Sequence, residues 1–305
     1  MEDRLKEYGL NIPKEIKYEV LGETSDGIII KVLKSTPSNY NYMLPPIPDG
    51  YKYVCGEWNS GFVIERISDG SQFVWVPVGS LDADGSHDGI KFNKKYGRRN
   101  FGDETINVRE FHGAFSEELS KENESVKKHG GFYIGRYATS LGSDGLLHSI
   151  KGAMPWRPRY YKEAKEGAAS FENNEFVWSS LVSGLAYDST LAWFIKSEAK
   201  DLYDIAYDST GWGNYWETEN SPHEVVETGF SEKWKANNIY DLAGNIHELT
   251  LEESRDNASI ALRGRAYYEL IPGVSYNVAC TLPFSKEHML MYKDTGNRIA
   301  LFLKD

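Results

Sequence analysis

Alternating hydrophobic and polar residues mark several short strands separated by turns. Gly61–Arg66 and Gln72–Val78 flank Ser68-Asp-Gly70, a sequence typical of a hairpin turn. The second of these strands is apolar on both faces, so we expect it to lie in the centre of a sheet. Gly131–Ala138 predicts another strand, and residues 239–303 alternate short strands with loops.

Helical sequences lie between these strands. Glu117–Lys128 is polar and helix-prone, Tyr160–Phe171 is rich in Ala, Glu and Lys, and Leu185–Lys196 carries its large apolar residues near one face. From Thr210 to Trp216 the chain is rich in Gly, Trp, Asn and Tyr, which predicts an ordered loop. The pattern indicates an α+β protein, and the absence of a repeat of about 20 to 50 residues argues against a solenoid.

The first 47 residues differ from the rest of the chain. Ile16–Leu21 and Gly27–Leu33 predict short strands, and the Ser-, Asn- and Pro-rich stretch Ser35–Pro48 predicts a linker. We therefore divide the chain into a segment 1–47 and a domain 48–305. Because two short strands form no core alone, we expect the first segment to tether or oligomerise the domain.

Charge excludes several classes of partner. The chain has 305 residues and a formal net charge of -11, which disfavours nucleic-acid binding and docking on anionic lipid. It has no apolar run long enough to span a membrane, and its start lacks the apolar stretch of a signal peptide. Localisation is left open, with association with a virion or a cell surface by a route other than Sec among the alternatives.

The sequence carries little recognisable catalytic chemistry. The two cysteines, Cys55 and Cys280, are too few for a disulfide framework, and we expect free, buried thiols, with a pairing between the two as the alternative. The seven histidines are scattered and form neither a zinc motif nor a metalloprotease motif. The chain also lacks a phosphate-binding Gly-rich loop and a nucleophile elbow.

Six segments, in order, resemble the formylglycine-generating-enzyme (sulfatase-modifying-factor) family. They are Phe73-Val-Trp-Val-Pro-Val-Gly79, Phe132-Tyr-Ile-Gly-Arg-Tyr-Ala-Thr139, Ser183–Phe194, Asn238-Ile-Tyr-Asp-Leu-Ala-Gly-Asn-Ile-His-Glu-Leu-Thr250, Leu262-Arg-Gly-Arg-Ala-Tyr267 and Gly296-Asn-Arg-Ile-Ala300. The resemblance implies a C-type-lectin-like α+β fold, with small antiparallel sheets, two helices and long ordered loops, over residues of about 50 to 303.

The same resemblance argues against catalysis. Enzymes of the family oxidise a substrate cysteine with copper, using two cysteines between the fifth and sixth of these segments. Here that interval, Tyr268–Thr295, contains only Cys280, and one thiolate cannot supply the paired soft ligands that copper(I) needs. We therefore expect no copper and no enzyme activity. A diverged oxidase acting on a peptide thiol is the alternative.

A structural calcium site is also implied by the resemblance. Carried over to this chain, its ligands are the Asp241 and Glu248 side chains and the carbonyls of Gly244 and Ile246. All four ligands are oxygen, as a hard cation requires. The alternative is that the two carboxylates only cap turn amides, without a metal.

The stretch between the last two segments is rich in Tyr, Ser, Asn and Thr, a composition typical of binding loops. Relatives of this fold include the variable proteins of diversity-generating retroelements in phages and mobile elements, which implies recognition of a protein or glycan by a variable surface. The expected contact residues are Arg265, Tyr267, Tyr268, Glu269, Ser275, Asn277, Leu282, Phe284 and His288. A purely structural virion component is a further alternative, and the apolar members of the set also suit a core.

Overall fold

A computed structural model describes most of the chain. Backbone and side chains are described for residues 45–57, 60–78, 117–205, 208–252, 260–267 and 294–304. The backbone alone is described for 18–24, 27–32, 108–110, 115–116, 206, 253–254, 259 and 284–287. Every structural statement below concerns these residues.

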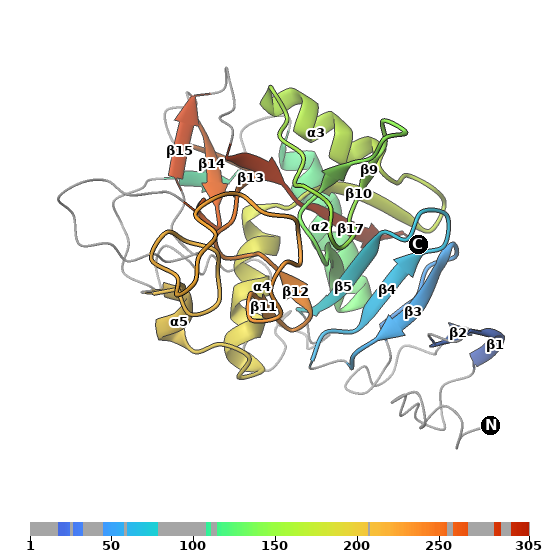
Figure 1. Cartoon of the computed structure of the whole chain (residues 1–305). Coiled ribbons are helices and arrows are strands. Elements are labelled where there is room, and N and C mark those ends of the chain that lie inside the picture. The colour runs from blue at the N-terminus through green and yellow to red at the C-terminus, as the bar shows by residue number, and fades with distance from the viewer. Residues whose placement is uncertain are drawn as a thin grey trace.

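A six-stranded antiparallel sheet forms the centre of the molecule (Figure 1). In spatial order its strands are β10 (Val177–Leu181), β17 (Ile299–Leu303), β7 (Gly131–Gly135), β5 (Gln72–Pro77), β4 (Val63–Arg66) and β3 (Tyr51–Cys55). The predicted hairpin is confirmed as β4 and β5, and β5 lies inside the sheet with residues 73–77 buried. The strand β17, from the C-terminal part of the described chain, lies between β10 and β7, which both come more than 100 residues earlier in sequence.

A second sheet contains strands from the C-terminal third of the chain. Its order is β15 (Phe284–Glu287), β14 (Ser259–Arg263), β13 (His247–Ser254) and β16 (Thr295–Asn297), and β6 (Val108–Glu110) also pairs with β13. The pair β13 and β16 is parallel, whereas β14 is antiparallel to both of its neighbours. Three two-stranded sheets complete the strands: β1 (Tyr18–Thr24) with β2 (Gly27–Val32), β8 (Ser140–Leu141) with β9 (Leu147–His148), and β11 (Lys235–Ala236) with β12 (Ile239–Tyr240).

Period-two alternation divides the central sheet between two hydrophobic clusters. Val74 and Val76 of β5 pack with the helix α4 (Gly184–Lys196), and Val126 of α2 (Phe115–His129) belongs to the same cluster. Their neighbours Phe73 and Trp75 face the other cluster, which includes residues of α3 (Tyr161–Ser170). Successive side chains of a strand point to opposite faces, so each face of the sheet is buried against its own helices.

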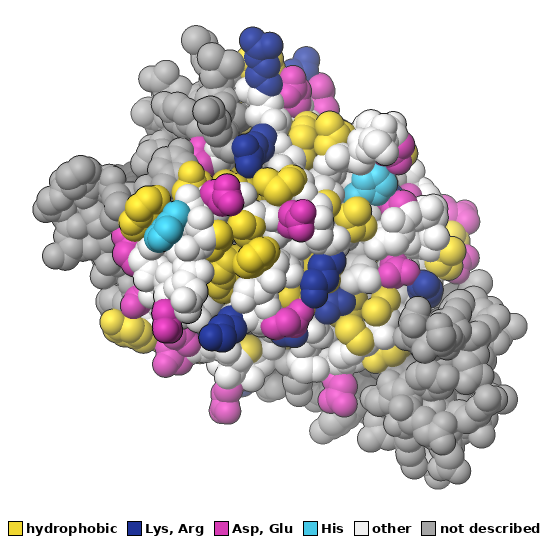
Figure 2. Space-filling model, viewed as in Figure 1, with side chains coloured by type: hydrophobic (Ala, Val, Ile, Leu, Met, Phe, Trp, Pro, Cys, Tyr) yellow, Lys and Arg dark blue, Asp and Glu magenta, His cyan; other side chains and the backbone are white. Residues whose placement is uncertain are grey.

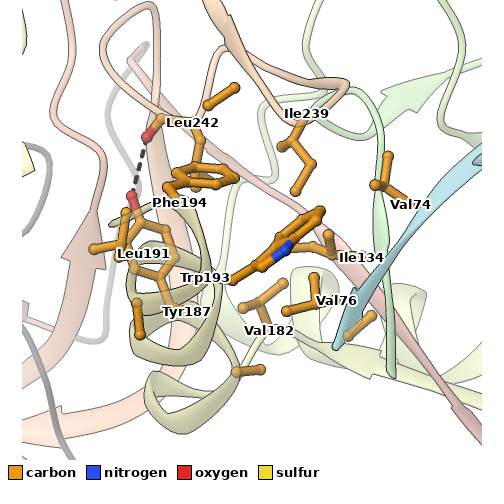
Figure 3. Close-up of a cluster of buried hydrophobic side chains, with 14 of the residues drawn as sticks. Val74, Val76, Ile134, Val182, Tyr187, Leu191, Trp193, Phe194, Ile239 and Leu242 are labelled. Carbon is orange, nitrogen blue, oxygen red and sulfur yellow. Dashed lines mark hydrogen bonds between the residues drawn. The ribbon is translucent and has the colours of Figure 1, made fainter. Parts of the chain in front are cut away.

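Helix α4 is buried more completely than its sequence pattern predicts. Residues 184–194 are all buried, instead of one apolar face alone. Trp193 points into a group that includes Val74, Val76, Ile134 and Val182 (Figure 3). The helix begins at Ser183, whose side chain accepts a hydrogen bond from the Ala186 amide. A helix surrounded by protein in this way is a core element rather than an amphipathic cover.

The remaining elements agree with the sequence in part. Helices are found at the expected positions α2, α3 and α4, and the five-residue α5 (Leu202–Ala206) was not expected. The two predicted N-terminal strands are confirmed as β1 and β2, while the division of the chain at residue 47 stays a prediction. None of the helices among the described residues is long and apolar enough to cross a membrane. The observed class is a mixed α+β arrangement of mainly antiparallel sheets with few helices.

Candidate functional site

The turn between β12 and β13 is the most constrained part of the predicted calcium site. Asp241, Gly244 and Asn245 all have positive φ angles, 55°, 72° and 64°. A Cβ at Gly244 would lie 2.4 Å from the backbone oxygen of Asn214. Hydrogen bonds from the Gly244 amide to the Gly264 carbonyl (2.8 Å) and from the Asn245 amide to the Asn214 carbonyl (2.8 Å) hold the turn. The turn is therefore fixed by two segments that are distant in sequence.

The two predicted carboxylate ligands lie inside the protein, 1% exposed each. Oδ2 of Asp241 accepts a 2.7 Å hydrogen bond from the Gly229 amide. Oε1 of Glu248 accepts bonds of 2.8 and 2.6 Å from Nε and Nη2 of Arg298. Oδ1 of Asp241 and Oε2 of Glu248 are buried with no hydrogen-bond partner. Each acid therefore keeps one oxygen for another cation or donor.

Burial disfavours the charged forms of both acids. Burial and, to a smaller degree, the Glu248 charge raise the pKa of Asp241 to about 7, against the opposing effects of the Gly229 amide and the Arg298 charge. Burial also raises the pKa of Glu248, although Arg298 acts in the opposite direction. A second positive charge at these oxygens would favour both carboxylates.

The calcium ligands implied by the resemblance fit this turn in chemistry. The free oxygens of Asp241 and Glu248 suit a hard cation, and the carbonyl of Gly244, which accepts a bond from the Ile246 amide, has a second lone pair. No group of three or more His, Cys, Asp or Glu side chains in the described part of the chain is placed to hold a metal ion. Backbone carbonyls and water would therefore have to complete the shell of a calcium ion here.

Two buried arginines, Arg263 and Arg298, fix the strands around this turn, and we call them the scaffold arginines. Arg263 donates to Glu252 from Nε (2.7 Å) and Nη2 (2.9 Å), and its Nη1 lies 3.2 Å from Oδ1 of Asp188. Besides its bonds to Glu248, Arg298 donates to the carbonyls of Gly135 and Tyr240 at 2.8 Å each. Both arginines are 0% exposed, so each charge is neutralised inside the protein.

The chain emerges from the scaffold directly after Arg263. Arg265 has a φ of 61°, and both Arg265 and Tyr267 are half-buried at the surface. Strand β15 pairs with β14 so that Phe284 lies opposite Leu262, which places the backbone of Phe284 beside the strand that leads to Arg265. The structure thus brings the backbone of these three predicted contact positions to the β14–β15 side of the second sheet. The other predicted contact residues lie outside the described residues: Tyr268, Glu269, Ser275, Asn277, Leu282 and His288.

A neighbouring loop, residues 208–227, contains functional candidates that the sequence reasoning missed, and we call it the acidic loop. The Tyr215 hydroxyl donates to the carbonyl of Gly264 (2.9 Å), which ties this loop to the segment that carries Arg265. Trp216 is 45% exposed, and its ring lies 4.2 Å from the His223 ring. Composition indicated an ordered loop, but it could not show which of the aromatic rings face the solvent.

Side chains on the visible face support this picture. Over the loops that are orange in Figure 1, Figure 2 shows hydrophobic side chains gathered with a histidine and several acidic groups. A separate cavity of about 680 Å³, lined by Lys121, Lys128 and Trp178, opens between α2 and the β10 edge of the central sheet. That cavity contains none of the residues that the sequence singled out.

The cysteines offer no paired thiols among the described residues. Cys55 is a free thiol at the end of β3, but it is half-buried instead of buried as the sequence predicted, and its Sγ lies 3.9 Å from Nη1 of Arg136. Cys280 lies outside the described residues.

Comparison with known proteins identifies no family. No protein-family model matches the chain, and no curated protein matches it. Among solved structures, variable protein 1 of Treponema denticola has 10% sequence identity and a TM-score of 0.29, over 75% of this chain and 84% of that one. A structure titled CarF has 10% identity and a TM-score of 0.32, over 66% of this chain and 97% of that one. Both TM-scores are too low to show a shared fold.

Proposed function

We propose that this chain is a non-catalytic binding protein with a C-type-lectin-like domain, which recognises a protein or glycan through the surface around Arg265 and Tyr267. The observation that carries the proposal is the change of environment within a few residues. Arg263 is fully buried in an ion-pair network, whereas Arg265 and Tyr267 are half-buried at the surface. A rigid base below accessible, amphipathic side chains favours binding, because little conformational entropy is lost on contact.

The binding test uses two probes, because the ligand class is broad. The purified full chain is applied to a glycan array and, separately, to a phage-displayed random-peptide library. The double variant Arg265→Ala/Tyr267→Ala should lose about tenfold or more of any selective signal, as expected for residues at the centre of an interface. Leu146→Ala, which removes a side chain that is 61% exposed in the turn between β8 and β9, is the matched control and should bind normally. Equal binding by the wild type and the double variant would reject the proposal.

The alternative is a diverged oxidase of the formylglycine-generating type. It needs two thiolates for copper(I), and the sequence places only one cysteine, Cys280, in the interval where the family has its pair. We therefore propose that the chain binds without copper chemistry. Purified protein supplied with copper and a cysteine-containing peptide should consume no oxygen above the rate of a Cys55→Ser/Cys280→Ser variant. Turnover that depends on copper and on a cysteine of this chain would establish the alternative.

Calcium is the cofactor that we propose for the turn of Asp241, Gly244, Ile246 and Glu248. Its support is the pair of buried carboxylate oxygens that no donor satisfies. When bound, calcium would neutralise these oxygens and tie β12 to the start of β13, while the scaffold arginines hold the surrounding strands. Its role is structural, so the contact surface itself would use side chains only.

We also propose that the binding surface is a diversified one, as in the variable proteins of diversity-generating retroelements. Its support is the composition of residues 264–293, which is typical of binding loops. The gene neighbourhood tests this point. A nearby reverse transcriptase and a template repeat that differs from this gene only at adenines are expected, and their absence would reject diversification while leaving the binding proposal intact.

A further inference from the structure

The acidic loop presents an aromatic pair to solvent. The Trp216 and His223 rings lie 4.2 Å apart with 42° between their planes, and both side chains are exposed. Trp212, four residues earlier in the chain, is only 1% exposed. The exposed Trp216 ring therefore adds little to the core, in contrast to the buried Trp212 ring. Exposed tryptophans are frequent anchors in protein interfaces.

The loop that carries this pair is held rigidly. Oγ1 of Thr218 donates to the Gly213 carbonyl (2.6 Å) and accepts from the Tyr215 amide (3.0 Å). Nδ2 of Asn214 donates to the Glu224 carbonyl (3.0 Å), which closes the loop across its base. The Trp216 ring is therefore positioned before any partner arrives, and its immobilisation adds little entropic cost to binding.

Charge selects the kind of partner. Residues 208–227 contain five acidic side chains and neither Lys nor Arg. Glu217 and Glu219 follow Trp216 in the chain, Glu224 follows His223, and all three are exposed. A tryptophan face attracts an ammonium or guanidinium group, and nearby carboxylates strengthen that attraction. The protein already uses this contact internally, because Nζ of Lys200 lies 5.1 Å from the Trp212 ring.

We infer that Trp216, His223 and the carboxylates of Glu217, Glu219 and Glu224 bind a Lys- or Arg-bearing segment of a protein partner. A basic side chain stacks on the exposed tryptophan face, and the glutamates neutralise its neighbours. The inference rests on the proposed binding function, for which it names the partner's chemistry. The buried Tyr215–Gly264 hydrogen bond ties the backbone of this loop to the segment that carries Arg265 and Tyr267.

The test uses a fluorescent hepta-arginine peptide and its hepta-glutamate counterpart, with binding to the full chain followed by fluorescence anisotropy. Hepta-arginine should bind and hepta-glutamate should not. Trp216→Ala should weaken hepta-arginine binding about fivefold or more, because the cation–π contact is lost. Trp216→Tyr should retain most of the affinity, because a tyrosine ring also attracts a cation. Phe230→Ala is the control, because this ring is also exposed, at 60%, but stacks on Trp234 in a segment that carries the two lysines Lys233 and Lys235.

Charge needs its own control, because any acidic protein attracts a basic peptide. The triple variant Glu217→Gln/Glu219→Gln/Glu224→Gln should weaken binding and reduce its dependence on salt. Replacing Glu57, Glu166 and Glu175 by Gln removes the same number of exposed charges elsewhere and should have a smaller effect. Equal losses in the two triple variants, or an unchanged affinity in Trp216→Ala, would overturn the inference.

This outcome is separable from that of the proposed function. Arg265→Ala/Tyr267→Ala tests the proposed function on the array and the peptide library, and hepta-arginine plays no part there. If that double variant keeps its library signal while Trp216→Ala loses hepta-arginine, the proposed surface is wrong and the basic-segment site stands. If only the double variant loses binding, the proposed function stands and the inference fails.

Discussion

Arg263 and Arg265 are the same residue type, two positions apart, in opposite environments. Arg263 is 0% exposed between Glu252 and Asp188, whereas Arg265 has a left-handed backbone conformation and a half-buried side chain at the surface. Trp212 and Trp216 repeat the contrast in the acidic loop, one ring buried and the other 45% exposed. The chain thus changes from scaffold to surface within two to four residues. Substitutions on the scaffold side should affect folding, and those on the surface side should affect binding.

The largest expected effect is at the scaffold. Arg263→Met removes the cation between two buried carboxylates, so the free energy of unfolding should fall by about 3–5 kcal/mol. Arg265→Met should change it by about 0.5 kcal/mol or less, as surface substitutions do. Urea unfolding of both variants measures the comparison. Similar losses at the two positions would contradict the division into scaffold and surface.

The second-largest loss of stability is expected at the turn that contains Gly244. Gly244→Ala places a Cβ 2.4 Å from the Asn214 backbone oxygen at a φ of 72°, and we expect a loss of about 3 kcal/mol. Gly145→Ala is matched in backbone conformation, with a φ of 78°, but its Cβ would meet no atom within 4 Å. That control should lose about 1 kcal/mol from strain alone. Equal losses would show that the close approach to Asn214 is unimportant.

Calcium should stabilise the fold through the turn of Asp241 and Glu248, which belongs to the scaffold side of the comparison. Adding calcium at about 100 times its Kd should raise the free energy of unfolding by about 2.7 kcal/mol relative to a chelator. Asp241→Asn should abolish this gain, and Glu175→Gln, an exposed charge, should not. Because burial raises the pKa of Asp241 to about 7, the Asn variant should be at least as stable as the wild type in chelator at higher pH. A wild-type melting temperature that is the same with calcium and with chelator would contradict the proposed calcium site.

The smallest expected effect concerns a less deeply buried ion pair, that of Arg66 and Asp69. Burial alone would raise the pKa of Asp69, but hydrogen bonds from Arg66 and from the Ser71 amide lower it to about 2 from the ordinary 3.8. The folded state therefore gains stability from this carboxylate above a pH of about 4, and the gain is lost as the pH falls towards about 2.

Asp69→Asn tests that gain. The substitution should cost about 1 kcal/mol at neutral pH, after allowance for solvent screening, and almost nothing at a pH of about 2. Unfolding of the wild type and the variant across this range measures it. A difference between them that is constant over the whole range would exclude the Asp69 carboxylate as its source.

Local pattern predicts the local elements of this fold. The β4–β5 hairpin, β7 and the three longer helices follow from period-two and helical sequences. The order of the six-stranded sheet does not, because β17 pairs with β10 and β7 across more than 100 residues of sequence. The burial of α4 on every side also escaped prediction, since it depends on which elements surround the helix.

The candidate site was predicted only in outline. The resemblance placed Asp241 and Glu248 together, and the structure buries both with one free oxygen each. It gave no sign that Arg263 forms an ion pair with Asp188, which lies 75 residues away, or that Arg298 forms one with Glu248. Sequence also cannot distinguish Trp212 from Trp216, because the two occur in the same Gly- and aromatic-rich loop. Ion-pair partners and side-chain exposure depend on tertiary contacts, and these contacts are seen only in the structure.

Hydrogen–deuterium exchange with a selected ligand tests the central claim most directly. The ligand is one that the glycan array or the peptide library yields, and exchange is followed by mass spectrometry with and without it. The account predicts that protection increases within residues 208–227 and 264–288, while strands β3 to β5 exchange as before. Protection confined to the central sheet or to the cavity beside α2, with none in those two segments, would contradict it.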